Sequence, residues 1–252
     1  MRLGATLVHL SPAPPYATAE WARRLVGAGF ESLWTPEIIG RGFLVPDPFV
    51  TLAAAATVTE DVELGTATLQ VPLHHPADLA HRILSLAAVC GDRLTLGVSP
   101  GSTKDDYDAL ERDHAGRFRV FRENVTRLRG LLADGRDEDA DLALPTSAAA
   151  GTSLLLGSWG ANVERAAREF DGWLASGYRS TVDEIVAAHD RYRAAGGGRA
   201  IVCAVPVSGG DLGPTGEALA RYADAGFDDA VVLIEPGGPD PERVRALFTQ
   251  TP

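Results

Sequence analysis

Short apolar runs, many of them β-branched, alternate eight times along this chain with longer segments of helical character. The later runs are apolar throughout, as expected of strands that are buried on both faces of a parallel sheet. Eight alternations in 252 residues predict an α/β fold, a single (β/α)8 TIM barrel, which typically needs about 250 residues. The expected strands are Leu3–His9, Ser32–Thr35, Glu63–Leu69, Arg93–Val98, Ser153–Gly157, Gly172–Ala175, Ala200–Val207 and Ala230–Glu235. The expected helices are Thr18–Ala28, Pro48–Thr59, Pro76–Val89, Gly116–Ala133, Ala161–Phe170, Thr181–Ala195, Thr215–Ala225 and Pro241–Phe248.

Charge and composition narrow the range of partners. The chain has 23 basic and 34 acidic side chains, a formal net charge of −11, which argues against nucleic acid or an anionic membrane. No apolar run is long enough to span a bilayer, and the first expected strand begins at Leu3, without a preceding signal peptide. The two cysteines, Cys90 and Cys203, are expected as small core side chains in a reducing cytoplasm. We therefore expect a cytoplasmic protein with a small-molecule substrate.

One segment interrupts the alternation. Residues 134–152 are first acidic (DGRDEDAD) and then small and apolar, and they exceed the usual length of a connection. We expect an irregular, exposed excursion within one domain that spans residues 1–252. Capping signals elsewhere agree with the expected helices, because Asp47 precedes Pro48 and because Thr181 and Glu184 have the spacing of a capping box.

The loops after the strands are the expected location of chemistry, because barrels of this class build their active sites at the carboxyl ends of the strands. The loop Gly157-Ser158-Trp159-Gly160 leads into the fifth expected helix, whose N-terminus favours an anion, and its glycines let backbone N–H groups approach a ligand. It is the candidate phosphate site, and Pro236-Gly237-Gly238 is the next candidate. Arg117 and Arg119 begin another helix and are candidates to face an anionic cofactor tail.

Three of these loops carry histidine or carboxylate side chains, namely His9, Glu37, and the pair His74 and His75. Their spacing matches no HxH or HExxH motif, and we expect no metal site. The signatures of dinucleotide-binding proteins and P-loop proteins are also missing from the sequence. Glu37, His9 and His74 are the candidate catalytic residues, although an ion pair with Arg41 at the rim would explain Glu37 equally well.

Three long segments resemble one known family. They are GFESLWTPEIIGRG at residues 29–42, DPFVTLAAAATVTEDVELGTATLQVPLHHPADLAHRILSLAAVCGDRLTLGVSPGS at 47–102 and LLLGSWGANVERAAREFDGWLASGY at 154–178. Together and in this order they resemble the luciferase-like monooxygenase superfamily. The resemblance covers the second to the sixth expected strand well, whereas the first, seventh and eighth agree only in character.

The resemblance implies a homodimeric (β/α)8 oxidoreductase that binds coenzyme F420, a deazaflavin, or FMN. The loop PEIIGRG favours the F420-dependent branch. The resemblance also implies an active-site role for Glu37. It further implies a bulge in the third strand at Ala67-Thr68, often with a non-proline cis peptide. The cofactor contacts that it implies are Ala67, Thr68, Ser99, Gly101, Ser102, Gly157, Ser158, Trp159 and Gly160.

The chain departs from the family pattern at two positions. Ile38 stands where several branches carry a catalytic histidine, so His9, His74 and His75 are the candidates to replace it. Pro100 lacks the N–H that a residue in this loop would otherwise offer to a cofactor. The alternatives therefore stay open: an FMN-dependent monooxygenase, or a non-catalytic barrel that binds a flavin or another ligand.

Overall fold

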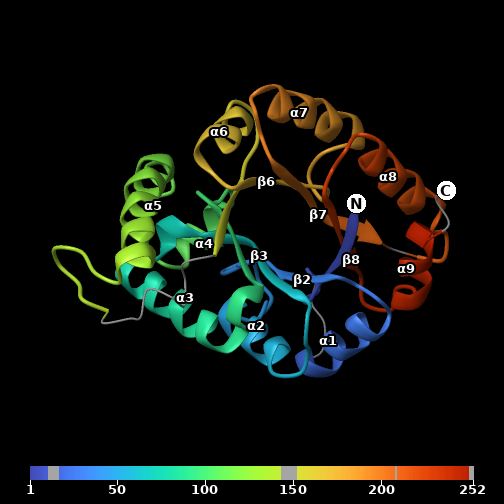
Figure 1. Cartoon of the computed structure of the whole chain (residues 1–252), viewed down its shortest axis with the longest axis horizontal. Helices are drawn as coiled ribbons and strands as arrows, with labels where there is room; N and C mark the ends of the chain where they lie inside the picture. Colours follow the sequence, from blue (N-terminus) through green and yellow to red (C-terminus); the bar gives the residue numbers. More distant parts are fainter. Residues whose placement is uncertain (11–16, 143–151, 208, 250–252) are drawn as a thin grey trace.

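A computed structural model describes residues 1–10, 17–142, 152–207 and 209–249 of the chain. Its eight strands are all parallel and form a closed barrel in sequence order, with β8 paired to β1. Figure 1 shows the helices as a ring around these strands. The predicted single (β/α)8 barrel is therefore confirmed. The strands are β1 (Arg2–Thr6), β2 (Ser32–Thr35), β3 (Glu63–Gln70), β4 (Leu94–Ser99), β5 (Ser153–Gly157), β6 (Gly172–Ser176), β7 (Arg199–Val207) and β8 (Asp229–Ile234).

Each helix predicted from the sequence is present. The principal helices are α1 (Thr18–Gly27), α2 (Pro48–Ala56), α3 (Pro76–Cys90), α5 (Arg117–Asp134), α6 (Asn162–Glu169), α7 (Val182–Ala194), α8 (Gly213–Asp224) and α9 (Pro241–Thr249). The predicted caps also form, since Asp47 accepts hydrogen bonds from two N–H groups of α2, and Thr181 and Glu184 make a capping box on α7. The sequence did not predict the short helix α4 (Lys104–Asp108), because five residues are too few to show a helical period. Two 3-10 turns, η1 (Val71–Leu73) and η2 (Gly91–Arg93), flank α3.

Several expected boundaries differ from the structure by one to three residues, as where α2 ends at Ala56 rather than at Thr59. β1 ends at Thr6 rather than at His9. Beyond Thr6 the regular ladder of strand hydrogen bonds ends. Leu7 N donates to the carbonyl of Trp34, and His9 Nδ1 forms a hydrogen bond with the carbonyl of Ile234. The excursion begins one residue later than expected, because Asp134 still belongs to α5. Residues 143–151 of the excursion lie outside the described part of the chain.

The barrel interior contains an apolar layer. Its buried side chains come from inward-facing positions of five strands, and they are Trp34, Leu155, Leu174, Ile201, Cys203 and Val231. Trp34 is fully buried, and its indole N–H donates to Ser32 Oγ at 2.9 Å. Gly65, on the neighbouring strand β3, leaves room for the Trp34 ring, because a Cβ atom there would lie 2.3 Å from it.

Gly65→Ala is expected to destabilise the protein by about 1–3 kcal/mol, because the added methyl group overpacks the barrel against Trp34. Urea unfolding measures the effect. Gly130→Ala is the matched control: this position lies within α5 and a Cβ there has no neighbour within 4 Å, so the same substitution should stabilise by up to about 1 kcal/mol. Equal stability of the two variants would contradict the packing argument.

A layer of charged side chains closes the amino-terminal end of the barrel, where the strands begin. Arg199 donates two hydrogen bonds to Glu63 at 2.8 Å each and one to Asp229 at 2.9 Å. Arg2 forms ion pairs with both carboxylates at 2.6 Å, and Thr95 donates to Glu63. Asp229 is fully buried, and its ion pairs with Arg2 and Arg199 offset the cost of burying a carboxylate. The charged layer and the apolar layer together support a cavity at the other end.

Candidate active site

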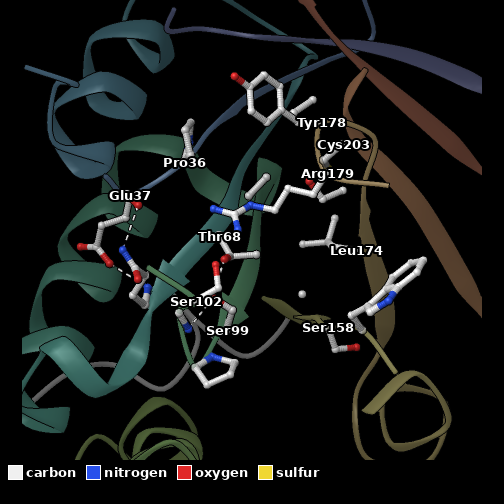
Figure 2. A pocket seen from close by; sticks show the side chains of 18 of the residues that line it. Pro36, Glu37, Thr68, Ser99, Ser102, Ser158, Leu174, Tyr178, Arg179 and Cys203 are labelled. Carbon is white, nitrogen blue, oxygen red and sulfur yellow. Dashed lines mark hydrogen bonds between the residues drawn. The ribbon is translucent and has the colours of Figure 1, made fainter. Parts of the chain in front are cut away.

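A cavity of about 800 Å³ lies at the carboxyl ends of the strands. This volume falls within the range of small-molecule sites, roughly 300–1,000 Å³. Figure 2 shows that its lining side chains come from both sides of the barrel mouth. Gly157 keeps one part of its wall flat, because a Cβ there would lie 2.6 Å from the methyl group of Thr68. The cavity therefore lies at the loops that follow the strands, where the sequence analysis expected the active site.

The third and fourth strands supply the first group of predicted contacts. The register between β3 and β4 shifts between Thr66 and Leu69, and the Ala67–Thr68 peptide is cis, as the resemblance implied. Thr68 Oγ1 donates to Ser99 Oγ at 2.7 Å, and Ser99 Oγ accepts from Gly101 N at 3.2 Å. Five of the predicted cofactor contacts line the cavity here, namely Ala67, Thr68, Ser99, Gly101 and Ser102.

The loop between β5 and α6 supplies the second group. Gly157, Ser158 and Trp159 line the cavity, and Trp159 is 44% exposed. Ser158 Oγ donates to the carbonyl of Asn162 at 3.1 Å, which ties the loop to the start of α6. Gly160 has a φ of +61° and is not among the described residues that line the cavity. Neither are the described residues Pro236, Gly237 and Gly238, the second candidate for phosphate.

Glu37 lines the cavity but is 5% exposed, and both of its carboxylate oxygens have partners. Oε2 accepts from Gln70 N at 2.7 Å, and His74 Nε2 donates to Oε1 at 2.7 Å. The alternative explanation of Glu37 as a partner of Arg41 is wrong, because Arg41 is bound bidentately to Asp106. Glu37 thus joins strand β2 to strand β3 beside the cavity (Figure 2).

The three histidines have different surroundings. His74 lies behind the cavity wall, where its ring binds Glu37, and Asn124 donates to its carbonyl. His9 Nδ1 lies 3.1 Å from the carbonyl of Ile234, and His75 caps α3 by accepting from Ala77 N. None of the three is among the described residues that line the cavity. Only His74 and Glu37 of the catalytic candidates are brought together.

Gln70 and Asp106 are site residues that the sequence analysis missed. The side-chain amide of Gln70 donates to the carbonyl of Glu37 at 3.1 Å and to Asp106 Oδ2 at 2.9 Å. Asp106 is fully buried, and it also accepts from Ile39 N and Arg41. Asp106 lies in α4, the helix that was not predicted, and an Asp in a polar stretch gave no sign of burial.

The described residues that line the cavity include four arginines, and within this part of the chain two of them have carboxylate partners. Arg41 is paired with Asp106, and Arg165 with Glu169 at 2.6 Å. Arg117 donates to the carbonyl of His114, and its Nε is buried without a hydrogen-bond partner. The guanidinium of Arg179 donates to the hydroxyl of Thr103 at 3.3 Å, and to no other described residue. Neither Arg117 nor Arg179 forms an ion pair within the described residues.

Arg119, the other candidate to face an anionic cofactor tail, is not among the described lining residues, and its guanidinium pairs with Glu123 along the same helix.

Two further groups near the cavity are held neutral. Burial raises the pKa of the Cys203 thiol well above its usual value, and burial also raises the pKa of Tyr107 to about 12. Both cysteines are buried and free, as predicted.

Neither a metal centre nor a membrane-spanning helix is found in the described ranges. In those ranges no three His, Cys, Asp or Glu side chains gather as metal ligands. The described helices include none with the length and apolarity needed to cross a bilayer.

The sequence profile of the luciferase-like monooxygenase family matches residues 2–227. The chain belongs to this family. A curated relative, 4-hydroxyprotoasukamycin monooxygenase from Streptomyces nodosus subsp. asukaensis, is 35% identical over 115 residues. That match covers 45% of this chain and 30% of the relative, so the chain spans less than a third of that relative's length.

Two solved structures share the fold over most of their length. An F420-dependent secondary alcohol dehydrogenase in complex with an F420–acetone adduct has a TM-score of 0.77 at 14% identity, over 99% of this chain and 97% of that one. The oxygenating constituent of 3,6-diketocamphane monooxygenase from Pseudomonas putida, in complex with FMN, has a TM-score of 0.67 at 18% identity, over 90% and 80%. At these identities the likeness concerns the fold. The family is one of oxidoreductases and monooxygenases, with F420- and FMN-binding structural neighbours.

Proposed function

We propose that this chain is an oxidoreductase that uses coenzyme F420 for hydride transfer to or from a small organic substrate in the cavity. The observation that carries the proposal is the cavity itself, about 800 Å³ at the carboxyl end of a luciferase-like barrel. A homodimer in the cytoplasm is part of the same proposal. A deazaflavin, when bound, supplies two-electron chemistry, and the protein then has to bind and orient the reactants and exclude water.

The lining residues fit a planar ring with hydrogen-bonding edges. The small residues Ala67, Ser99 and Gly157 leave open space over the apolar layer. Two buried oxygens, Thr35 Oγ1 and Gln70 Oε1, line the cavity side of the barrel and have no hydrogen-bond partner among the described residues. A hydroxyl and an amide oxygen each have accepting capacity, so a small movement of the wall would let either oxygen accept a hydrogen bond from a ligand.

The anionic part of the cofactor is assigned to the β5–α6 side. There Gly157, Ser158 and Trp159 line the cavity before α6, whose first N–H groups favour an anion. Arg117, at the start of α5, adds a cation without a carboxylate partner. At the opposite side, Ile38 supplies no proton, and Glu37 is engaged on both oxygens. In this proposal Ile38 and Glu37 therefore help to orient the reactants rather than exchange protons with them.

Direct titration separates the proposal from its two alternatives. The purified protein is titrated with oxidised and reduced F420 and, separately, with oxidised and reduced FMN. Tighter binding of F420 supports the proposal, and tighter binding of FMN supports an FMN-dependent monooxygenase, as the FMN-bound neighbour allows. Tight binding of either cofactor without turnover over a broad substrate panel supports a non-catalytic binding barrel.

Gly160→Asp is expected to weaken cofactor binding by about tenfold or more, because it adds a negative charge beside the phosphate. The fold should persist, since a Cβ at Gly160 meets no atom within 4 Å and Asp tolerates its φ of +61° comparatively well. Gly160→Asn is the control, with a similar shape and no charge. Unchanged affinity in a folded Gly160→Asp protein would move the phosphate elsewhere, with Pro236–Gly238 as the next loop to test.

A further inference from the structure

Arg179 is a cation in the cavity mouth that the proposed function does not use. It follows β6, in the loop that leads to α7, and its side chain is exposed. Figure 2 shows this side chain extending from the loop into the cavity, in the direction of Thr68. Its hydrogen bond to the hydroxyl of Thr103 leaves most of its five N–H donors free for a ligand.

The carboxylates that line the same cavity do not neutralise Arg179. Glu37 is held by Gln70 and His74, and Glu184 accepts from the backbone and the hydroxyl of Thr181 in the capping box. Arg41 and Arg165, by contrast, each have a carboxylate partner. The mouth of the cavity therefore presents an uncompensated guanidinium, the group that binds carboxylate and phosphate oxygens in a bidentate way.

We propose that Arg179 recognises an anionic group, a carboxylate or a phosphate, on the organic substrate of this enzyme. Arg117 and the β5–α6 loop lie on the neighbouring sector of the rim, since β5 pairs with β6, so the cofactor's own anion and a substrate anion can be bound side by side. Tyr178, which is 55% exposed beside Arg179, offers an apolar face to the body of such a substrate. The inference rests on the proposed function in assigning this anion to the substrate.

The test uses three probes of similar shape: benzoate, phenyl phosphate and neutral benzamide. Isothermal titration calorimetry measures their binding to the purified protein, with and without F420. We expect at least one anionic probe to bind about tenfold more tightly than benzamide, and the stronger of benzoate and phenyl phosphate identifies the preferred anion. Arg179→Gln should remove this preference, and Arg179→Lys should keep part of it, because it retains the charge without the planar fork.

Arg119→Gln is the matched control, because it removes the same charge from an arginine that is paired with Glu123 outside the described lining. It should leave probe binding unchanged. The inference is overturned if benzamide binds the parent protein as tightly as both anions, or if Arg119→Gln and Arg179→Gln lose the preference equally. It is also overturned if Arg179→Gln weakens F420 or FMN binding as much as anion binding, since Arg179 would then contact the cofactor.

The two hypotheses fail in different ways. If neither cofactor binds the parent protein, the proposed function fails. An anion preference that Arg179→Gln still abolishes would nonetheless support Arg179 as the group that recognises an anionic ligand of the cavity.

Discussion

Arg199→Met is expected to destabilise the barrel by about 3–5 kcal/mol, because it leaves the carboxylates of Glu63 and Asp229 buried without their main cation. Arg199 approaches Glu63 in a bidentate geometry and Asp229 through Nε, so one side chain serves both acids. Arg2 contacts the same acids, but its side chain is 43% exposed, and it cannot replace the buried fork. Chemical denaturation at pH 7 measures the loss.

Arg221→Met is the control for this experiment. Arg221 pairs with Asp183 at the surface, where both side chains are at least half exposed, and such pairs contribute about 0–1 kcal/mol. A similar loss in the two variants would show that the charged layer contributes no more than a surface pair.

The pH dependence of stability provides a second measurement on the same Arg199→Met variant. Burial alone would raise the pKa of Glu63, but the hydrogen bonds and charge of Arg199, together with the Thr95 hydrogen bond and the charge of Arg2, outweigh burial and hold this pKa below 4.5. Glu63 therefore stabilises the parent protein above pH 4.5, and this contribution is lost as the pH falls through the lowered pKa. In Arg199→Met burial dominates and the pKa of Glu63 rises, so protonation relieves the variant. The stability gap between parent and variant should narrow between pH 7 and pH 4.5.

The barrel could be predicted from the sequence because each strand is short, apolar and punctuated by caps or glycines. The charged layer could not be predicted. Its residues stand at the first positions of strands, and charged residues at such positions are normally expected to be exposed to solvent. Arg199 and Glu63 are 136 residues apart, and only closure of the barrel makes them neighbours. The same reason hides the pairing of Gln70 with Asp106, since neither residue carries a local signal of burial.

Some residues of the candidate site could likewise be predicted from the sequence, and others could not. The β3, β4 and β5 loops were predictable, since the family pattern marks Thr68, Ser99 and Gly157 directly. The catalytic candidates were less so, because a loop position does not say which way a side chain points. His9 and His74 both follow strands as expected, yet they bond to Ile234 and Glu37 beside the cavity.

Glu37→Ala is expected to destabilise the protein by about 2–4 kcal/mol, because it removes the acceptor of two groups at once. Gln70 N–H and His74 Nε2–H both donate to the Glu37 carboxylate, and each unsatisfied buried donor costs about 1–3 kcal/mol. Denaturant unfolding measures the global effect, and amide hydrogen exchange at Gln70 gives a local readout. Exchange there should accelerate, because the amide loses its only acceptor in this arrangement.

Glu37→Gln separates the loss of charge from the loss of shape. Its single amide oxygen can accept from only one of the two donors, so we expect a destabilisation between those of the parent and Glu37→Ala. Glu20→Ala, at an exposed position in the first turn of α1, is the control and should change stability by less than about 0.5 kcal/mol. If Glu37→Ala matched that control and left Gln70 exchange slow, Glu37 would not position the cavity wall. Its carboxylate would then be free to act on a ligand, as the sequence alone had suggested.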